Sequence, residues 1–408
     1  MHLARLSLTN FRNYARLDIP VPQGVVLLVG GNAQGKTSLL EAIYFLATFV
    51  SFSATSERQL INFLVGRQDL AVCRIVAEIC RTDIGTESLH KLEVRLIQET
   101  NGVGNHSRYK KEILLDNVPR KVSESVGFFN AVLFLPHTMR VIEGAPEDRR
   151  RYMNLTLAQV IPDYAPALSA YSRTLAQRNA LLKQIKERNS DPNQLAFWDE
   201  QMAYSGAKII HARIQAVQEL GHSAAVIHHQ LTRGEEVLRL SYEPAYDPLV
   251  KPQDQYTLPI DAPVDRTGIS ISEIQDGLHE RLESLRFEEI ARGVTTIGPH
   301  RDDLRFLSNG LDLGIYGSRG QTRTAVLALK LTEVDWMKEK TGQWPVLLLD
   351  EVLAELDTLR RSDLLERLTS FDQAILTTTD LDLFDSEFVE RANTWRIQSG
   401  SVIEQVGS

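Results

Sequence analysis

One stretch constrains the fold of this 408-residue chain more than any other. An apolar run rich in valine, GVVLLVG (24–30), leads into the glycine-rich turn GGNAQGKT (30–37). The turn opens KTSLLEAIYFLATF, in which Leu39, Ile43 and Leu46 recur at helical spacing. A strand, a glycine turn and a helix in this order form a phosphate-binding loop. Because a continuously apolar strand is expected at the centre of a parallel sheet, the chain is predicted to be an α/β protein.

The phosphate-binding loop predicts both a ligand, ATP, and the residues that hold it. Glycines let backbone N–H groups turn towards phosphates, and the helix N-terminus adds partial positive charge. Lys36 is expected to reach the β- and γ-phosphates, and the Thr37 hydroxyl to bind Mg²⁺. The predicted nucleotide-binding residues of this loop are Gly30, Gly31, Asn32, Ala33, Gln34, Gly35, Lys36, Thr37 and Ser38.

A second predicted strand carries carboxylates. VLLLDE (346–351) is four apolar residues followed by an Asp and a Glu. A strand of this kind would deliver Asp350 beside the phosphate-binding loop, where it can hold Mg²⁺. Glu351 would then polarise the attacking water as general base. We therefore predict Lys36 and Glu351 as catalytic residues.

A second polar loop, GSRGQTRTAVLALK (317–330), lies almost three hundred residues after the first. Ser318, Gly320 and Gln321 open a predicted helix, and a helix N-terminus with a Ser hydroxyl is again a phosphate-binding device. Since one ATP needs only one phosphate-binding loop, the second is useful if it reaches ATP held by another copy of the chain. An ordinary N-capped helix is the alternative interpretation.

The chain changes character after residue 136. Residues 147–232 are polar and helix-forming, and a loop rich in Pro and Asp (241–268) precedes one more amphipathic helix. That helix has Ser270 or Ser272 as candidate N-cap and Gly293 as its stop. We therefore predict a mixed-sheet head built from residues 1–136 and 295–408, with a mainly helical arm domain, 137–294, inserted between them.

Charge and cysteine content narrow the classes of partner and compartment. Residues 1–240 hold 28 Lys and Arg against 23 Asp and Glu, whereas the remaining residues hold 17 against 30, giving the net charge of −8. A polyanion would therefore meet the first part of the chain rather than the last. The two cysteines, Cys73 and Cys80, are too few for a disulfide framework and are expected to be buried thiols. Because the cysteines are interpreted as reduced thiols, we expect a reducing cytoplasm as the compartment. No apolar run approaches the length of a membrane span.

These motifs together resemble one family. GGNAQGKTS, then SRGQ, then VLLLDEVLAELD ending at Asp357 follow the order of an ABC-type ATPase head: Walker A, signature, Walker B and D-loop. A long insertion between the halves of the head resembles the SMC-like group, and within it the RecF family. The matching stretches span nearly the whole chain: LSLTNFRNY, GGNAQGKTSLLEAIYFL, GAPEDRRRYMN, TTIGPHRDDL, YGSRGQTRTAVLALKLTE and LLLDEVLAELD.

The resemblance implies a weak, DNA-stimulated ATPase that binds ATP and Mg²⁺ and forms a homodimer in its ATP-bound state. It implies that the protein binds double-stranded DNA near single-strand gaps and helps RecO and RecR to load a recombinase. The family's acidic pair after LFLP is replaced by His137 and Thr138, and Asn154 stands where an Asp is usual. The threonines of LTTTD stand where transporter cassettes have a switch histidine.

Several basic clusters are candidates for contact with DNA phosphates, a sequence-independent and salt-dependent interaction. For each cluster, a solvated surface or an internal ion pair is an equally good interpretation. GPHRDD (298–303), with His300, Arg301 and Asp303, would either build part of the nucleotide-dependent interface or cap a strand. The DNA candidates are Arg108, Lys110, Lys111, Arg120, Lys121, Arg149, Arg150 and Arg151.

Two other classes of function fit parts of the pattern. The first is an ABC cassette that drives a membrane transporter, against which the long insertion and the missing switch histidine speak. The second is a phosphate-loop enzyme of small-molecule metabolism, such as a kinase, which would leave SRGQ unexplained.

Overall fold

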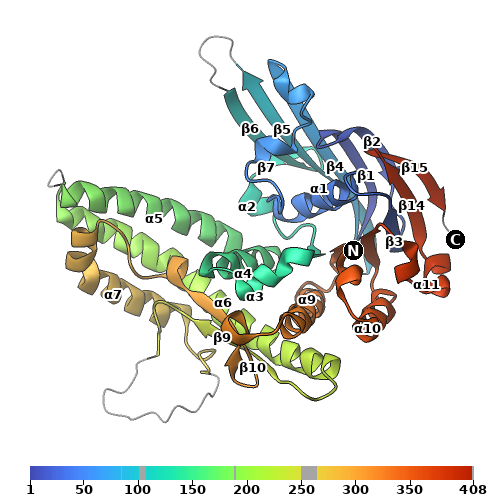
Figure 1. Ribbon diagram of the computed structural model, residues 1–408. Helices are drawn as coiled ribbons and strands as arrows, with labels where there is room; N and C mark the ends of the chain where they lie inside the picture. The colour runs from blue at the N-terminus through green and yellow to red at the C-terminus, as the bar shows by residue number, and fades with distance from the viewer. Residues whose placement is uncertain (84, 101–106, 188–189, 250–263, 407–408) are drawn as a thin grey trace. The chain divides into compact units, whose positions relative to one another are not determined.

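A computed structural model describes residues 1–83, 85–100, 107–187, 190–249 and 264–406. The contacts divide the chain into two compact units (Figure 1). The first contains Met1–Thr138 and Glu333–Ser408, and the second contains Met139–Thr332. Residues 250–263 of the predicted Pro-rich loop lie outside the described residues.

The first unit contains two six-stranded sheets. One is antiparallel, in the order β2-β1-β4-β5-β6-β7, and the other is mixed, in the order β15-β14-β3-β13-β12-β8. The strands of the antiparallel sheet are β1 (His2–Phe11), β2 (Tyr14–Pro20), β4 (Leu70–Asp83), β5 (Thr86–Thr100), β6 (Ser107–Leu115) and β7 (Val118–Arg120). Those of the mixed sheet are β3 (Gly24–Val29), β8 (Ala131–Phe134), β12 (Val346–Asp350), β13 (Gln373–Thr378), β14 (Asn393–Gln398) and β15 (Ser401–Val406).

The mixed sheet joins the two ends of the sequence. Strand β3 lies between β13 and β14 and is parallel to both, and β12 continues the sheet in parallel between β13 and β8. The predicted central strand GVVLLVG is therefore confirmed, and its residues Val26, Leu27 and Leu28 are fully buried. The strand VLLLDE is confirmed as β12, which is buried throughout.

Helix α1 (Lys36–Thr48) packs between the two sheets of the first unit (Figure 1). Its buried residues Leu40 and Phe45 share one apolar core with Leu6 of β1, Ile75 of β4 and Leu348 of β12. Burying apolar side chains from both sheets holds the helix N-terminus at a defined position over the sheet. The other helices of this unit are α2 (Val122–Ser125), α10 (Thr358–Leu368) and α11 (Ser386–Arg391), with 3₁₀ turns at Glu57–Leu60, Val65–Arg67, Pro136–Met139, Val352–Glu355 and Leu381–Leu383.

Two details of this unit concern a hairpin and the cysteines. Residues 111–120 belong to the hairpin β6–β7. Asp116 and Asn117 both have positive φ, as a tight two-residue hairpin turn requires. Cys73 is buried as predicted and burial raises its pKa, but Cys80, although also a free thiol, is only partly buried.

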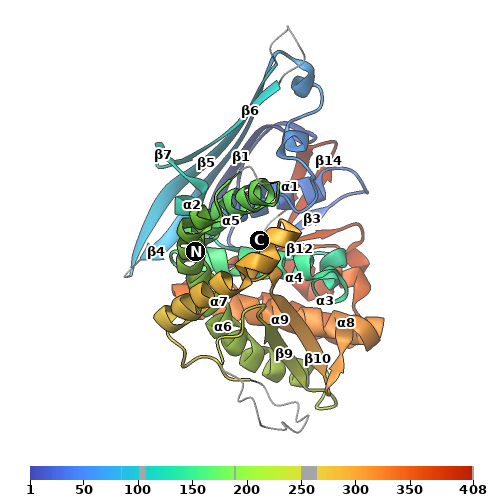
Figure 2. The ribbon, with the colours of Figure 1, turned by 90° about the vertical axis from the view of Figure 1, so that its left-hand side faces the viewer.

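The second unit is mainly helical. Helices α5, α6 and α7 pack side by side, and β9 lies against α6 (Figure 2). Its helices are α3 (Arg140–Glu143), α4 (Pro146–Val160), α5 (Tyr164–Lys186), α6 (Leu195–Leu231), α7 (Ile271–Arg292), α8 (Leu313–Tyr316) and the first part of α9 (Arg319–Thr341). Its strands β9 (Leu238–Glu243), β10 (Asp303–Ser308) and β11 (Leu311–Asp312) form an antiparallel sheet in the order β11-β10-β9, and 3₁₀ turns occupy Pro192–Gln194 and Pro299–Arg301.

Helix α7 has the predicted ends. Ser270 is its N-cap and forms a reciprocal capping box with Glu273, and Gly293 ends the helix in the left-handed conformation. The contacts group residues 295–332 with this helical unit, because β10 pairs with β9 across the insertion. The extent expected for the head, with its second half at 295–408, remains a prediction.

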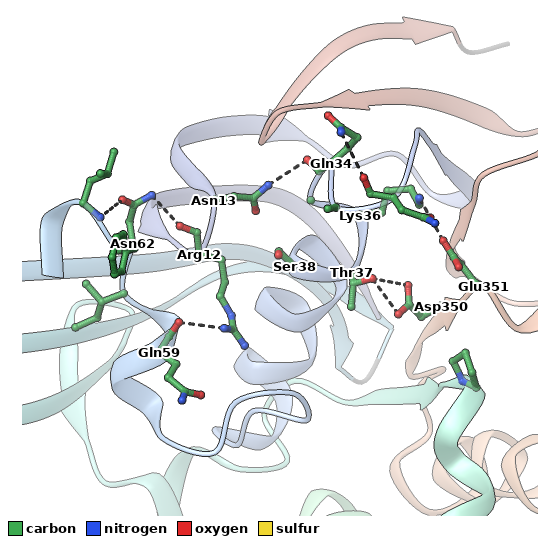
Figure 3. Close-up of a pocket in the computed structure, with 17 residues that line it drawn as sticks. Arg12, Asn13, Gln34, Lys36, Thr37, Ser38, Gln59, Asn62, Asp350 and Glu351 are labelled. Carbon is green, nitrogen blue, oxygen red and sulfur yellow. Dashed lines mark hydrogen bonds and ion pairs between the residues drawn. The ribbon is translucent and has the colours of Figure 1, made fainter.

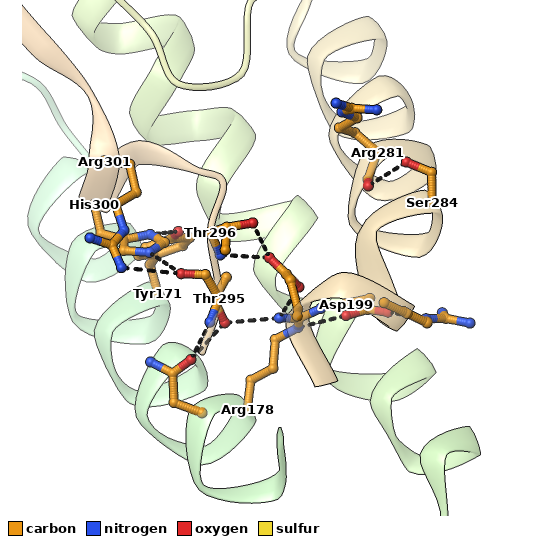
Figure 4. A network of polar contacts seen from close by, with 12 residues as sticks. Tyr171, Arg178, Asp199, Arg281, Ser284, Thr295, Thr296, His300 and Arg301 are labelled. Carbon is orange, nitrogen blue, oxygen red and sulfur yellow. Dashed lines mark hydrogen bonds and ion pairs between the residues drawn. The ribbon is translucent and has the colours of Figure 1, made fainter. Parts of the chain in front are cut away.

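A buried polar network ties α5, α6 and α7 together (Figure 4). Arg178 of α5 pairs with Asp199 of α6 at 2.7 Å and with Glu289 of α7 at 2.6 Å, and all three side chains are fully buried. Arg178 also donates to the Thr295 hydroxyl at 2.8 Å. Arg286 of α7 also pairs with Asp199 at 2.6 Å. Because a buried carboxylate is costly without its partner, these two guanidinium groups favour the observed packing of the three helices.

Replacing Arg178 with Met should lower the free energy of unfolding by about 3–5 kcal/mol, since Glu289 would stay buried without its cation and Asp199 would keep only Arg286, 2.6 Å away. Chemical denaturation followed by circular dichroism measures the change. Arg173→Met, at an exposed position of the same helix, is the matched control and should change stability by about 0.5 kcal/mol or less. Equal losses in the two variants would contradict the assigned role of the network.

The same network region makes stability depend on pH. Burial lowers the pKa of His300 to about 4, and its ring nitrogens contact the Tyr171 hydroxyl at 2.7 Å and the Thr295 carbonyl at 3.3 Å. Because the unfolded imidazole titrates near its ordinary value of 6.5, stability is lost as pH falls from 6.5 towards 4. Between pH 7 and pH 5, His300→Gln should lose about 2 kcal/mol less than the parent chain in denaturant titrations. Parallel pH profiles for the two proteins would contradict this.

Candidate nucleotide-binding site

The predicted phosphate-binding loop connects β3 to α1, and close neighbours require glycine at two of its positions. A Cβ at Gly30 would lie 2.4 Å from the carbonyl oxygen of Ile397 in β14. A Cβ at Gly35, where φ is +119°, would lie 2.7 Å from the Asn13 amide nitrogen. Tyr14 supports the turn by donating its buried hydroxyl to the Gly35 carbonyl at 3.1 Å. The loop is therefore packed between β14 and the β1–β2 hairpin.

The four residues with predicted chemical roles come together at the end of this loop (Figure 3). The Thr37 hydroxyl lies 3.0 Å from both carboxylate oxygens of Asp350. The Lys36 ammonium donates to the carbonyls of Gly30 at 2.7 Å and Gly31 at 3.1 Å, and pairs with Glu351 at 3.2 Å. The phosphates of a bound nucleotide can replace the three contacts of Lys36, because its ammonium is the cation expected to bind them.

Burial distinguishes the two carboxylates. Asp350 is largely buried, and this raises its pKa, opposed by hydrogen bonds from the hydroxyls of Thr377 and Thr37. Glu351 is 40% exposed and sits in the left-handed backbone region with φ of 53°. The inner carboxylate is thus held by hydroxyls, whereas the outer one faces solvent and can reach water.

The donors in this site fit a magnesium ion. Mg²⁺ prefers oxygen ligands and is commonly held by one or two protein groups together with nucleotide phosphates. Thr37 and Asp350 supply a hydroxyl and a carboxylate at one point. Within the described part of the chain, no cluster of three or more His, Cys, Asp or Glu side chains could hold a metal by itself.

A cavity of about 680 Å³ opens over the loop and contains all of these groups. Beyond the loop it is lined by Arg12 and Asn13 and by residues of the segment 59–64, of which Gln59 and Asn62 are labelled in Figure 3. The Phe63 ring is 69% exposed and lies 4.1 Å beneath the Arg67 guanidinium. The cavity therefore offers a polar, cationic end for phosphates and an exposed aromatic ring at its edge. Ser38 of the predicted set also lines it.

Two supports of the loop were missed from the sequence. The turn between β14 and β15 contacts the loop at Gln34: the Ser399 N–H donates to its side-chain oxygen at 2.8 Å and the Gly400 N–H to its carbonyl at 2.9 Å. The Asn13 amide donates to the same carbonyl at 3.1 Å. Asn13 belongs to the family motif LSLTNFRNY, which could have identified it as a functional residue. The C-terminal hairpin has no sequence motif that indicates its contact with the loop.

The second predicted phosphate-binding device lies in the second unit, at the start of α9. Ser318 and Gln321 form a reciprocal cap: the Gln321 N–H donates to the Ser318 hydroxyl at 3.2 Å, and the Ser318 N–H to the Gln321 side chain at 3.0 Å. The Gln321 amide also donates to Glu236 at 3.1 Å. Ser318 and Gly320 are exposed, so the helix N-terminus is open to a ligand.

Asp357 has a local structural role. It is the N-cap of α10, where its carboxylate accepts from the Arg360 N–H at 3.0 Å, and it also pairs with the Arg360 side chain. Its part in the nucleotide site remains a prediction.

The basic residues proposed to contact DNA differ in their ion pairs and in their exposure to solvent. Arg149 pairs with Asp303 at 2.6 Å, and Arg150 donates to the Asp302 carbonyl at 2.8 Å. Lys110 pairs with Glu112, and Lys111 with Glu57, each at 2.5 Å. Arg108, Lys110, Arg120, Lys121 and Arg151 are exposed, and Lys121 lies 3.8 Å from Glu124.

The departures from the family pattern are accommodated locally. The side-chain oxygen of Asn154 accepts from the Tyr164 hydroxyl at 2.8 Å and from buried Arg213 at 3.0 Å. An amide oxygen can make both of these contacts without a second buried carboxylate beside Asp302, which already pairs with Arg213 at 2.7 Å. The Thr138 hydroxyl accepts from the Leu135 N–H at 2.8 Å.

Comparison with known proteins defines the class. The sequence pattern of the RecF/RecN/SMC N-terminal domain family matches residues 2–396. A solved structure of an SMC head bound to the C-terminal winged-helix domain of ScpA has the same fold, with a TM-score of 0.51 at 14% identity. The chain therefore belongs to the RecF/RecN/SMC family, whose fold is that of an ATPase head with mixed sheets and helices.

Full-length relatives narrow the assignment. The DNA replication and repair protein RecF of Roseiflexus castenholzii is 39% identical, with 98% of this chain and 99% of that protein covered. RecF of Bacillus subtilis is 35% identical, with coverage of 99% and 100%. A solved structure of the recombination mediator RecF with ATP, from the RecFOR pathway, has a TM-score of 0.81 at 29% identity, covering 100% of this chain and 98% of that one. The chain belongs to the RecF family of DNA replication and repair proteins, and the transporter alternative is not favoured.

The support from the C-terminal turn can be tested by Gly400→Ala. Gly400 has φ of +70°, and an added Cβ would lie 2.3 Å from the Asn13 carbonyl oxygen, so the turn should move away from Gln34. We expect the Kd for ATP to rise roughly tenfold, equivalent to about 1.4 kcal/mol, in fluorescence titrations. Gly342→Ala is the matched control, because its φ is +73° and a Cβ there has open space. Similar affinities for both variants would contradict the assigned support.

Proposed function

We propose that this chain is an ATP-switched DNA-binding protein of recombinational repair and replication restart. The observation that carries the proposal is the convergence of Lys36, Thr37, Asp350 and Glu351 at one end of the mixed sheet. Membership of the RecF family supports ATP as the nucleotide, since a solved relative is described as RecF with ATP. We infer a cytoplasmic location, because the substrate is chromosomal DNA. No helix among the described residues is long and apolar enough to cross a bilayer.

Different residues of the site have different roles in ATP hydrolysis. The loop amides from Gly30 to Thr37 and the Lys36 ammonium bind the phosphates. Thr37 and Asp350 hold Mg²⁺, which neutralises phosphate charge when bound. Glu351 accepts a proton from a water that attacks the γ-phosphorus, and the bond to the oxygen bridging β and γ breaks to release ADP and phosphate. Hydrolysis is slow and stimulated by DNA, so that it resets a switch.

The second half of the site comes from another copy of the chain. Ser318, Gly320 and Gln321 open α9 with an exposed N-terminus, and Ile315 and Tyr316 beside them are 68% and 72% exposed. Exposed apolar side chains next to a phosphate-binding helix N-terminus are suited to a surface that a partner covers. In this proposal the ATP-bound homodimer closes each signature loop, together with Asp357, on the nucleotide of the partner.

Basic side chains bind DNA through its phosphate backbone. Arg108, Arg120 and Lys121 of the first unit extend into solvent and suit duplex phosphates, as does Arg151 of the second unit. Arg149, Arg150 and Lys111 are less exposed and would have to leave Asp303, the Asp302 carbonyl and Glu57, which makes them weaker candidates. Double-stranded and gapped DNA are the proposed substrates. RecR and RecO are the proposed partners in loading a recombinase, in line with the relative assigned to the RecFOR pathway.

The test is the solution mass of Glu351→Gln with and without ATP and Mg²⁺, measured by sedimentation. The substitution should reduce hydrolysis at least about 100-fold by removing the general base, so that the ATP state persists. We expect the 46.0 kDa chain to double in mass with ATP only. Adding Ser318→Arg should abolish the doubling without reducing binding of ATP to the monomer.

Two outcomes would overturn the proposal. If the chain binds ATP but stays monomeric, the proposal of a nucleotide site shared between two copies is wrong. Lys36→Ala, which should neither bind ATP nor dimerise, is the control for nucleotide dependence. Equal affinity of Glu351→Gln for gapped duplex DNA with and without ATP would remove the switch.

A further inference from the structure

One threonine hydroxyl joins the two carboxylate residues of the site. The Thr377 hydroxyl donates to Asp350 Oδ1 at 2.7 Å and accepts the backbone N–H of Glu351 at 3.0 Å. We infer that Thr377 is a positioning residue for ATP hydrolysis, which holds the side chain of Asp350 and the backbone of Glu351 in their working arrangement. This inference rests on the proposed function for its kinetic consequence and on the described contacts for its geometry.

Strand pairing explains why this residue has the required reach. In the parallel pair β12–β13, Thr377 is the register partner of Asp350. Both residues are buried, with exposed fractions of 4% and 8%, so their contact is shielded from water. A hydroxyl has one proton to donate and lone pairs to accept, and this side chain uses both functions on neighbouring residues of the facing strand end.

The backbone of Glu351 needs such a contact. Glu351 has φ of 53° and ψ of 20°, the left-handed region that residues with a side chain rarely adopt. A conformation of this kind persists where neighbouring groups hold it. The hydrogen bond from its N–H to Thr377 holds the turn that follows β12. This turn directs the Glu351 carboxylate towards the Lys36 ammonium, 3.2 Å away.

The adjacent residue Thr378 makes different hydrogen bonds, so the effect of the Thr377 hydroxyl can be tested separately. The Thr378 hydroxyl donates to the Asp380 carbonyl at 2.7 Å and accepts the Asp380 N–H at 3.1 Å. It is as buried as Thr377, at 3%, but it serves the loop after β13 and not the carboxylates. Two neighbouring threonines of one strand therefore provide a test residue and a matched control.

The experiment compares Thr377→Val, Thr377→Ser and Thr378→Val in the full chain. Valine keeps the shape of threonine and removes the hydroxyl, whereas serine keeps the hydroxyl. We expect Thr377→Val to lower kcat for ATP hydrolysis at least tenfold with KM changed less than threefold. Thr377→Ser should stay within about threefold of the parent, and Thr378→Val should keep both constants.

Amide hydrogen exchange gives a readout that does not need hydrolysis. In the nucleotide-free chain, the peptide that contains Glu351 should exchange at least tenfold faster in Thr377→Val, because its N–H has lost its acceptor. The same peptide should be unchanged in Thr377→Ser and Thr378→Val.

The outcomes separate this inference from the proposed function. Unchanged exchange at Glu351 in Thr377→Val overturns the inference, and so does a kcat within twofold of the parent. Equal losses of kcat in Thr377→Val and Thr378→Val also overturn it, because they would reduce Thr377 to a packing role. If the Glu351 amide exchanges faster in Thr377→Val but the parent chain hydrolyses no ATP, the proposed function is overturned. The positioning contacts of the Thr377 hydroxyl are then still supported.

Discussion

The pairing of β3 with β13 and β14 is the constraint on which the rest of the site depends. All three strands are parallel, so their carboxyl ends lie at one edge of the mixed sheet. The phosphate-binding loop leaves β3 at that edge, Asp350 ends the next strand but one, and Thr377 lies on the strand between them. A shift of the register by one residue would turn Thr377 away from Asp350, because neighbouring residues of a strand face opposite sides.

Much of this arrangement could be predicted from local patterns. Valine-rich and leucine-rich runs identified β3 and β12, and the glycine turn with its following helix identified the loop, because each pattern reflects chemistry within a few residues. The N-cap and stop of α7 were predicted for the same reason. Asp350 and Glu351 could be paired with the loop because carboxyl ends of parallel strands share an edge.

The remaining features depend on contacts between distant residues. The hydroxyl of Thr377 has no sequence signature, since its role comes from the register of β13 against β12. Gly400 looks like any hairpin glycine until Asn13 and Gln34 lie against it. The run Arg149–Arg151 suggests a cationic surface, yet Arg149 and Arg150 contact Asp303 and the Asp302 carbonyl, which lie far along the chain.

The discontinuity of the mixed sheet also affects how the chain is made. The antiparallel sheet uses residues up to Arg120, so it can form early on the ribosome. Strand β3 has to wait for β13 and β14, which are synthesised roughly half a minute later at about 10 residues per second. During that interval an apolar strand lacks both neighbours, a state prone to non-native pairing. The nascent chain therefore depends on the early sheet and α1, or on chaperones, to shield β3 until translation reaches its partners.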